Sequence, residues 1–233
     1  MSPLDLMRLY VETANRLDDL GRMFDTNDGL QSPAPKLFYG ATSRGACWYF
    51  GHEVAKSNAE HLDSLLKDET QPYAPNTPLT LECHEEVLKR LKNDANELRI
   101  ETGPFYWYPD PTEVFESTEL LGKDDEHRLR ETLSPGGTHY GFCSPSAASL
   151  DGEEVAAICC SVRKRSAAHI AGCETESKFR RRGHATKAVT RWANAVPGTQ
   201  RGALYNTTWA NAASRKTAAA TKAVQFAVGI AIY

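Results

Sequence analysis

The pattern of apolar and polar positions is clearest between residues 170 and 196. A short strand candidate at 170–176 is followed by a basic, glycine-containing loop at 178–185. Beyond the loop, apolar residues recur at steps of three, one, three, one and three, which places them on one face of a helix: Ala185, Ala188, Val189, Trp192, Ala193 and Val196. Pro197-Gly198 then stops the helix. The pattern predicts a strand, a loop and a helix, and the rest of the chain is organised around them.

Elsewhere the pattern predicts a mixture of strands and helices. Aromatic strands are expected at 36–39 and 46–50 around a turn at 43–45. Residues 4–25 fit either a helix or a hairpin. The remaining expected elements, in chain order, are helices at 53–67 and 80–93, a strand at 97–108, a charged helix at 116–133, and strands at 138–142, 154–162 and 203–209.

A strand, a loop containing Gly183 and a helix start together favour an anion. The first helical turn has N–H groups without helical acceptors, and the helix dipole adds positive potential there. The charge distribution agrees. Residues 1–160 hold 14 Lys/Arg and 28 Asp/Glu, a net charge of −14, whereas residues 161–233 hold 13 and 2, a net charge of +11. The basic part suits a polyanion, either coenzyme A or nucleic acid; the acidic part either attracts a cationic acceptor or only solvates the surface.

The loop sequence Arg180-Arg181-Arg182-Gly183-His184-Ala185 reads R-x-x-G-x-A. It resembles the coenzyme-A loop, Q/R-x-x-G-x-G/A, of the GNAT superfamily of acetyl-CoA-dependent N-acetyltransferases. The order of the surrounding parts is similar too: a strand carrying 173–175 precedes the loop, and an amphipathic helix and a second strand follow. Asn211-Ala-Ala-Ser214 at the next helix start looks like the second signature of that family. An arginine-rich surface turn is the alternative interpretation of the loop alone.

The resemblance implies an α+β fold, with a GNAT-type central sheet that is mostly antiparallel, splayed and flanked by helices. The acetyltransferase domain is expected over 96–233 and a smaller N-terminal α+β unit over 1–95. Parts of this N-terminal stretch look similar to bacterial GNAT proteins that carry an N-terminal extension.

The resemblance also assigns a coenzyme site. The backbone around Cys173 and Thr175 would hold the pantetheine and the thioester, and the loop would hold the pyrophosphate of acetyl-CoA. The full set of expected coenzyme-binding residues is Cys173, Thr175, Arg180, Arg181, Arg182, Gly183, His184, Ala185, Thr186, Asn211 and Ser214. For Asn211, a plain helix N-cap is an equally good interpretation.

Glu174 is the first candidate for the general base that deprotonates the acceptor amine, and His169 is the second. A surface glutamate paired with Arg163 or Lys178 is the alternative for Glu174. Cys173 has no His or Asp partner at a recognisable spacing, so direct attack of the amine is expected rather than an acyl-enzyme. No metal site is expected, because the Cys83-His84 pair and the scattered histidines lack ligand spacing.

The chain departs from the family pattern near its end. Many GNAT enzymes carry a tyrosine in the last helix as the acid for the leaving thiolate, where this chain has Thr217-Ala218-Ala219-Ala220. Tyr205 and the C-terminal Tyr233 are the tyrosines considered for this role instead. The glycine that usually closes the helix is replaced around Lys222. One strand then precedes the end, where many relatives have two. The N-terminal part or a second subunit, in a homodimer, could supply the missing edge. The absent tyrosine keeps a non-catalytic acyl-CoA-binding protein open, and the basic part keeps a nucleic-acid binder open as a less favoured class.

The expected partners are therefore a coenzyme A thioester and a small amine or a protein amine as acceptor. No signal peptide or membrane-spanning stretch is evident, so a cytoplasmic protein is expected. The six cysteines lack paired spacing and are expected to be reduced thiols. Cys159 and Cys160 are adjacent in a strand, so their side chains are expected to face opposite ways.

Overall fold

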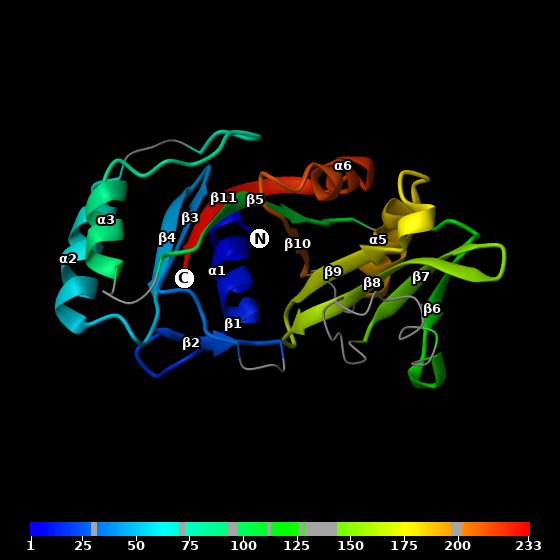
Figure 1. Cartoon of the computed structure of the whole chain (residues 1–233), viewed down its shortest axis with the longest axis horizontal. Helices are drawn as coiled ribbons and strands as arrows, with labels where there is room; N and C mark the ends of the chain where they lie inside the picture. The colour runs from blue at the N-terminus through cyan, green and yellow to red at the C-terminus, as the bar shows by residue number, and fades with distance from the viewer. Residues whose placement is uncertain are drawn as a thin grey trace. The chain divides into compact units, whose positions relative to one another are not determined.

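The computed structural model describes residues 1–28, 32–69, 73–92, 97–110, 113–125, 128, 144–196 and 202–233. They form two compact units, each assembled from separate stretches of chain (Figure 1). Unit 1 comprises 1–105, 206–210 and 225–233, and unit 2 comprises 106–205 and 211–224. Both combine helices with a mostly antiparallel sheet, so the predicted α+β class is confirmed.

Unit 1 begins with a helix and a hairpin, which resolves the ambiguity of residues 4–25. The Ser2 hydroxyl accepts the Asp5 N–H at 3.2 Å and starts the first helix. The elements of unit 1 are α1 (Pro3–Ala14), β1 (Asn15–Leu17), β2 (Met23–Thr26), β3 (Leu37–Thr42), β4 (Gly45–Phe50), α2 (Lys56–Lys67), α3 (His84–Leu91), the first part of β5 (Ile100–Trp107) and nearly all of β11 (Val224–Ile232).

The sheet of unit 1 pairs a strand from the first quarter of the chain with the last strand. β3 pairs with β4 as the predicted hairpin, and its other edge pairs antiparallel with β11, from Leu37 opposite Ile232 to Thr42 opposite Ala227. The N-terminal part thus supplies the strand beside the last strand, which was one of the two origins considered for it.

Helices cover both faces of β3. Leu37, Tyr39 and Ala41 face a core shared with α2 and α3, which lie side by side in Figure 1. Phe38, on the opposite face of the strand, stacks on Tyr10 of α1 with ring centroids 6.0 Å apart. The alternation of side chains along a strand explains why six consecutive residues of β3 are all buried.

Unit 2 contains the strand, loop and helix that the sequence singles out. Its strands run in the order β6-β7-β8-β9-β10, and every pairing except that of β9 with β10 is antiparallel. The elements are the end of β5, β6 (Thr118–Leu121), η1 (Lys123–Asp125), β7 (Ser146–Asp151), β8 (Glu154–Lys164), β9 (His169–Thr175), η2 (Ser177–Phe179), α5 (His184–Ala195), β10 (Ala203–Asn206) and α6 (Ala212–Ala220).

The helix expected over 116–133 is wrong at its start. Residues 118–121 form β6, which pairs with β7 and buries Leu121 against Ala148 and Ile158. Strand pairing therefore overrides the local helical pattern of charged residues. The rest of that prediction beyond residue 125, apart from Arg128, and the strand expected at 138–142 lie outside the described residues.

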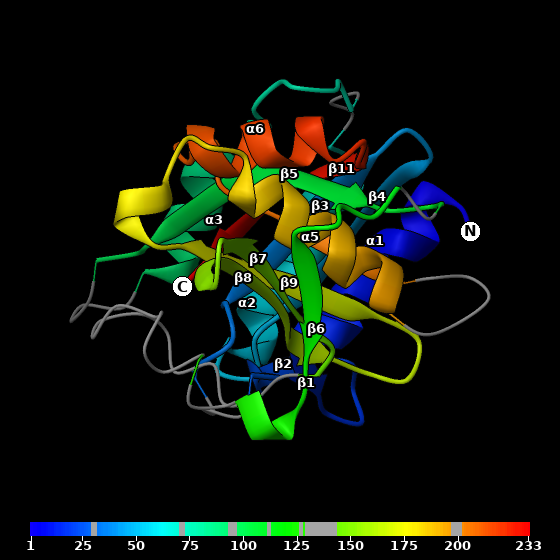
Figure 2. The same cartoon turned by 90° about the vertical axis from the view of Figure 1, so that its right-hand side faces the viewer.

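The helix α5 packs across β7, β8 and β9, as Figure 2 shows. Its Trp192 is fully buried, and the Trp192 indole N–H donates to the Ser161 hydroxyl of β8 at 3.0 Å. Ala188, Val189 and Ala193 pack in the same core. The predicted apolar face of the helix is thus the buried one, and it fixes where α5 starts relative to β9.

Gly103 lies where two backbone segments of unit 1 meet, and its replacement tests this packing. A Cβ on Gly103 would sit 1.8 Å from the Thr207 carbonyl oxygen, whereas a Cβ on Gly122 would have 3.7 Å to the Asp125 carboxylate. We expect Gly103→Ala to lower the free energy of unfolding by about 3 kcal/mol or more, and Gly122→Ala to change it little. Urea denaturation of both variants measures this, and equal stabilities would contradict the observed close approach.

Candidate functional site

Strand β9 is bound differently along its two edges. On one edge it pairs with β8 along its length, from Lys164 opposite His169 to Ala157 opposite Thr175. On the other edge the parallel register with β10 joins Ala203 to His169 and Leu204 to Ile170, and it ends there. The strands part beyond this point, so the predicted splay next to the loop is present.

Successive residues of β9 direct their N–H and C=O groups alternately toward β8 and toward β10, and this alternation shows which groups lie where β9 and β10 diverge. The Glu176 N–H donates to the Ala156 carbonyl at 3.0 Å, so Glu176 directs its N–H toward β8. Because antiparallel partners alternate between bonded and non-bonded pairs, Glu174 directs its N–H and C=O toward β8 as well. The N–H and C=O groups of Cys173 and Thr175 therefore point to the opposite edge. We call this part of β9, from Ala171 to Thr175 on the side of β10, the splayed edge.

The loop after β9 turns through two left-handed residues. Arg181 has a φ of 63° and Gly183 a φ of 84°, and Gly183 is the N-cap of α5. The left-handed conformation costs a non-glycine residue free energy, and this cost explains why glycine occupies position 183. Lack of space is not the reason, because no atom lies within 4 Å of where a Cβ would be.

The first turn of α5 offers free N–H groups to an anion. The first helical bond runs from the Lys187 N–H to the Gly183 carbonyl at 3.2 Å. The N–H groups of His184, Ala185 and Thr186 come before it, and no side chain in the described part of the chain caps the helix. Three such N–H groups at a helix start favour an anion, so the anion site expected from the sequence stays a prediction for this position.

Cations surround this helix start and already have partners. The Arg182 guanidinium lies 3.1 Å from the Asp151 carboxylate, Lys178 is paired with Glu154, and the Arg180 Nε donates to the Thr175 carbonyl at 3.4 Å. All three side chains are exposed, and exposed pairs of this kind contribute little to stability. A phosphate could therefore take over these cations at small cost.

His184 anchors the helix start to the sheet. Its side chain is buried, and Nδ1 lies 2.9 Å from the Ser149 hydroxyl of β7, while the ring meets Phe179 edge-on at 5.8 Å. Burial is the largest cause that lowers the pKa of His184, and the nearby Lys187 lowers it further. His184 therefore positions α5, and its backbone N–H remains available to a ligand.

His169 lies at the paired end of β9. It is buried, its Nδ1 is 2.8 Å from the Ser161 hydroxyl, and the same hydroxyl accepts the Trp192 indole N–H. Burial lowers its pKa as well. This network ties α5 to the sheet core, and the position before the splay is a poor one for a base that must meet a substrate.

Glu174 is partly buried and lies within the diverging stretch of β9. Its side chain points to the face opposite that of Cys173, whose side chain packs on the core under α5. Glu176 shares the face of Glu174, and its carboxylate lies 3.9 Å from the Lys178 ammonium. The alternative interpretation, a pairing of Glu174 with Arg163 or Lys178, is not among the ion pairs of the described residues, and Glu174 remains the first candidate for the base.

Tyr205 adds a hydroxyl that the sequence suggested only weakly. The side chain is buried, and its OH lies 2.7 Å from the Ser214 hydroxyl at the start of α6. Asn211 caps this helix by accepting the Ser214 N–H at 3.0 Å. Burial is the main cause that raises the pKa of Tyr205, and Cys173 also raises it. The strand position of Tyr205 gave no local signal for this contact, because Ser214 lies on another element.

The last helix matches the departures noted in the sequence. α6 contains no tyrosine, and Lys222 just after it has a φ of 58°, the left-handed conformation that glycine usually supplies. The C-terminal Tyr233, the other tyrosine considered for the thiolate, belongs to unit 1, where the Arg99 guanidinium lies 4.1 Å from its ring centre.

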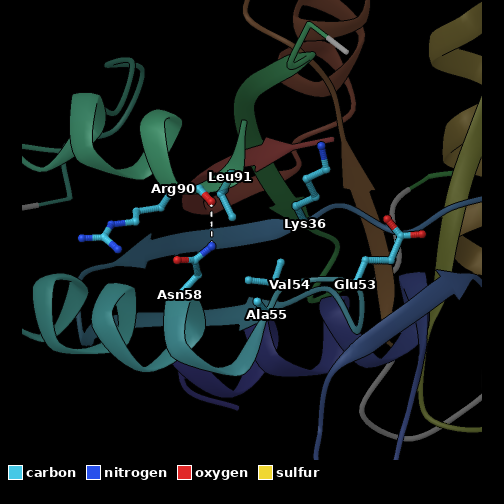
Figure 3. Close-up of a pocket in the computed structure, with 7 residues that line it drawn as sticks. All are labelled: Lys36, Glu53, Val54, Ala55, Asn58, Arg90 and Leu91. Atoms are coloured by element: carbon cyan, nitrogen blue, oxygen red, sulfur yellow. Dashed lines mark hydrogen bonds between the residues drawn. The ribbon is translucent and has the colours of Figure 1, made fainter. Parts of the chain in front are cut away.

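A small pocket of about 100 Å³ lies in unit 1 (Figure 3). Its lining residues are Lys36, Glu53, Val54, Ala55, Asn58, Arg90 and Leu91, and the Asn58 amide donates to the Arg90 carbonyl at 3.0 Å. None of the residues expected at the coenzyme site lines it. Across the described ranges, no group of three or more His, Cys, Asp or Glu side chains could hold a metal ion. No helix in that same part of the chain is long and apolar enough to cross a membrane.

Among known proteins, the chain is similar to solved structures but not to any family model or curated sequence. A GCN5-related N-acetyltransferase-like protein from Streptococcus suis is similar over 98% of this chain and 99% of its own, at 12% identity and a TM-score of 0.49. An acetyltransferase from the GNAT family from Colwellia psychrerythraea is similar over 98% and 96%, at 13% identity and a TM-score of 0.48.

A third similar structure is described as a GNAT-family protein from Novosphingobium aromaticivorans. It matches at 12% identity with a TM-score of 0.47, over 57% of this chain, and the chain spans 64% of its length. All three TM-scores are below 0.5, so the function of the chain is inferred from its own strand register, loop and helix start.

The two buried histidines predict how stability depends on pH. Each has a folded-state pKa below the usual value of 6.5, so the unfolded chain binds protons first as the pH falls. The free energy of unfolding is expected to be level above about pH 7 and to decrease as the pH falls through about 6.5 toward the folded pKa values. His184→Gln should reduce this decrease, and His52→Gln, at an exposed position, should not. A slope that is the same in all three proteins would contradict the assignment.

Proposed function

We propose that the chain is an N-acetyltransferase that moves an acetyl group from acetyl-CoA to a primary amine. One observation carries the proposal: β9 parts from β10 immediately before a glycine-turned loop and an uncapped helix start. Backbone hydrogen-bonding groups along a splay suit an extended amide chain such as pantetheine, and the helix start suits its pyrophosphate. The R-x-x-G-x-A loop supports the same interpretation.

In this proposal the coenzyme binds mainly through backbone groups. The pantetheine arm lies along the splayed edge, where the N–H and C=O groups of Cys173 and Thr175 serve it in place of a neighbouring strand. The N–H groups at 184–186 take the pyrophosphate, and Arg180 and Arg182 add charge-assisted bonds from the side. Asn211 and Ser214, at the start of α6, are proposed to border the same path.

The reaction needs a base for the amine and a donor for the carbonyl oxygen. The amine nitrogen attacks the thioester carbon directly, and an N–H of the splayed edge stabilises the oxyanion that forms. Glu174 accepts the ammonium proton, either itself or through water. Its position within the diverging stretch of β9 supports this role, whereas the buried, paired position of His169 makes His169 a positioning residue.

Tyr205 is proposed as the proton donor to the departing thiolate. A phenol is protonated at neutral pH, as a donor requires, and Tyr205 lies in the core on which Cys173 also packs. The Ser214 hydroxyl holds the phenol oxygen in place. A tyrosine on β10 would thus replace the one that the last helix lacks.

The coenzyme site is tested at Gly183. Gly183→Val should raise the Kd for acetyl-CoA about 10- to 100-fold, because a β-branched residue disfavours the left-handed turn that directs the helix start. Gly21→Val is the matched control, since Gly21 also has a positive φ of 75° with nothing within 4 Å and lies in unit 1. Isothermal titration measures both. Unchanged affinity in a folded Gly183→Val protein would remove the pyrophosphate site.

The base is tested at Glu174, once an acceptor has been found by screening amines for release of free thiol. Glu174→Gln should lower kcat by about 10²–10⁴-fold with the Kd for acetyl-CoA nearly unchanged. Glu153→Gln, in the exposed turn between β7 and β8, should leave both unchanged. Binding of acetyl-CoA without thiol release from any amine would favour a non-catalytic acyl-CoA-binding protein instead.

A further inference from the structure

We propose that Cys159 and Cys173 form a dithiol site that reacts with small disulfides and closes into a disulfide beneath the splayed edge. The site lies next to the proposed path of the coenzyme. Oxidation of the two cysteines would therefore regulate acetyl transfer, and this regulatory effect rests on the proposed function. The formation of the disulfide itself depends only on the two cysteines.

The strand register places the two cysteines directly opposite each other. Cys159 of β8 and Cys173 of β9 are register partners in the antiparallel pair. The hydrogen bond from the Glu176 N–H to the Ala156 carbonyl fixes which pairs of the ladder are hydrogen-bonded. The pairs on either side, Ile158 with Glu174 and Cys160 with Gly172, are therefore hydrogen-bonded pairs. Cys159 and Cys173 are therefore a non-hydrogen-bonded pair, in which opposed side chains come closest.

The distance expected for such a pair suits a disulfide. Opposed Cα atoms of a non-hydrogen-bonded pair lie about 4.5 Å apart, inside the range of about 4.4–6.8 Å that disulfides span. Both side chains point to the α5 face, where they belong to or pack on one core. Burial raises the pKa of the Cys159 thiol most, and the neighbouring Cys173 raises it further.

The two thiols differ in access, which sets the order of the reaction. Cys159 is fully buried, and this burial is the main cause that raises its pKa. Cys173 is partly exposed and lies on the strand that borders the splay. A small disulfide therefore meets Cys173 first, and Cys159 acts second, within the same molecule.

The steps balance with a low-molecular-weight disulfide as oxidant. The Cys173 sulfur attacks one sulfur of the reagent, which releases one thiol and leaves a mixed disulfide. The Cys159 sulfur then attacks Cys173, breaks the mixed bond and releases the second thiol. The protein dithiol loses two electrons and two protons, and the reagent gains both. Coenzyme A disulfide is the reagent that the proposed site favours, because its own arms fit the path to Cys173.

Bound acetyl-CoA and the oxidant should exclude each other. A pantetheine arm along the splayed edge covers the side from which Cys173 is reached. Saturating acetyl-CoA is therefore expected to slow the oxidation about tenfold or more, as expected for a site that is mostly occupied. This protection, unlike the disulfide, depends on the proposed coenzyme site.

The test treats the full chain with oxidised glutathione and, separately, with coenzyme A disulfide, in the absence of acetyl-CoA. Mass spectrometry of the intact chain and of its peptides should show one internal disulfide that joins Cys159 to Cys173. Cys159→Ala should instead stop at a stable mixed disulfide on Cys173. Cys160→Ala is the matched control: it is the next residue, it faces the other side of the sheet, and it should leave the disulfide unchanged.

Three results would overturn the proposal: no internal disulfide in the wild-type chain, a wild-type disulfide that uses other cysteines, or an internal disulfide between Cys173 and another cysteine in Cys159→Ala. The wild-type peptide linkage decides the matter even if a variant fails to fold. If the disulfide forms but acetyl-CoA neither binds nor protects, the dithiol site stands and its link to acetyl transfer falls. If acetyl-CoA binds and no disulfide forms, the proposed function stands and the dithiol site falls.

Discussion

The backbone of β9 is the constraint on which the site depends. A strand inside a sheet needs partners on both edges, because an unpaired buried N–H or C=O costs free energy. β8 satisfies one edge of β9 throughout, but β10 leaves the other edge after Ile170. Beyond that point, the N–H and C=O of Cys173 and the N–H of Thr175 are directed to the side of β10, while the Thr175 carbonyl accepts from the Arg180 Nε at 3.4 Å. A strand left half-paired in this way offers backbone groups to the coenzyme in the proposed function.

Two side-chain networks hold that arrangement in place from one side of the sheet. The Ser161 hydroxyl joins His169 of β9 to Trp192 of α5, and Ser149 joins β7 to His184. Both histidines are buried, and their low pKa values keep them neutral partners at neutral pH. The helix start is thereby fixed at the end of β9 by packing and hydrogen bonds, and its backbone N–H groups are left for an anion.

Local signals explain what the sequence could predict. The strand, the loop and the apolar face of α5 follow from periodicity and from Gly183, and Asn211 is the helix cap that its residue type suggests. Contacts between residues far apart in the sequence could not be predicted. Examples are the pairing of β3 with β11 and the hydrogen bond between the hydroxyls of Tyr205 and Ser214. β6 was missed because its pairing with β7 outweighs a locally helical pattern.

The most direct measurement follows the backbone amides of unit 2 by NMR while acetyl-CoA is added. We expect large shifts, and slowed hydrogen exchange, for the N–H groups of Cys173 and Thr175 on the splayed edge and of residues 184–186 at the start of α5. The N–H groups of Gly172 and Glu174, which already serve β8, should change far less. Binding of acetyl-CoA that leaves the first set unchanged and alters other amides would contradict a coenzyme site on the splayed edge.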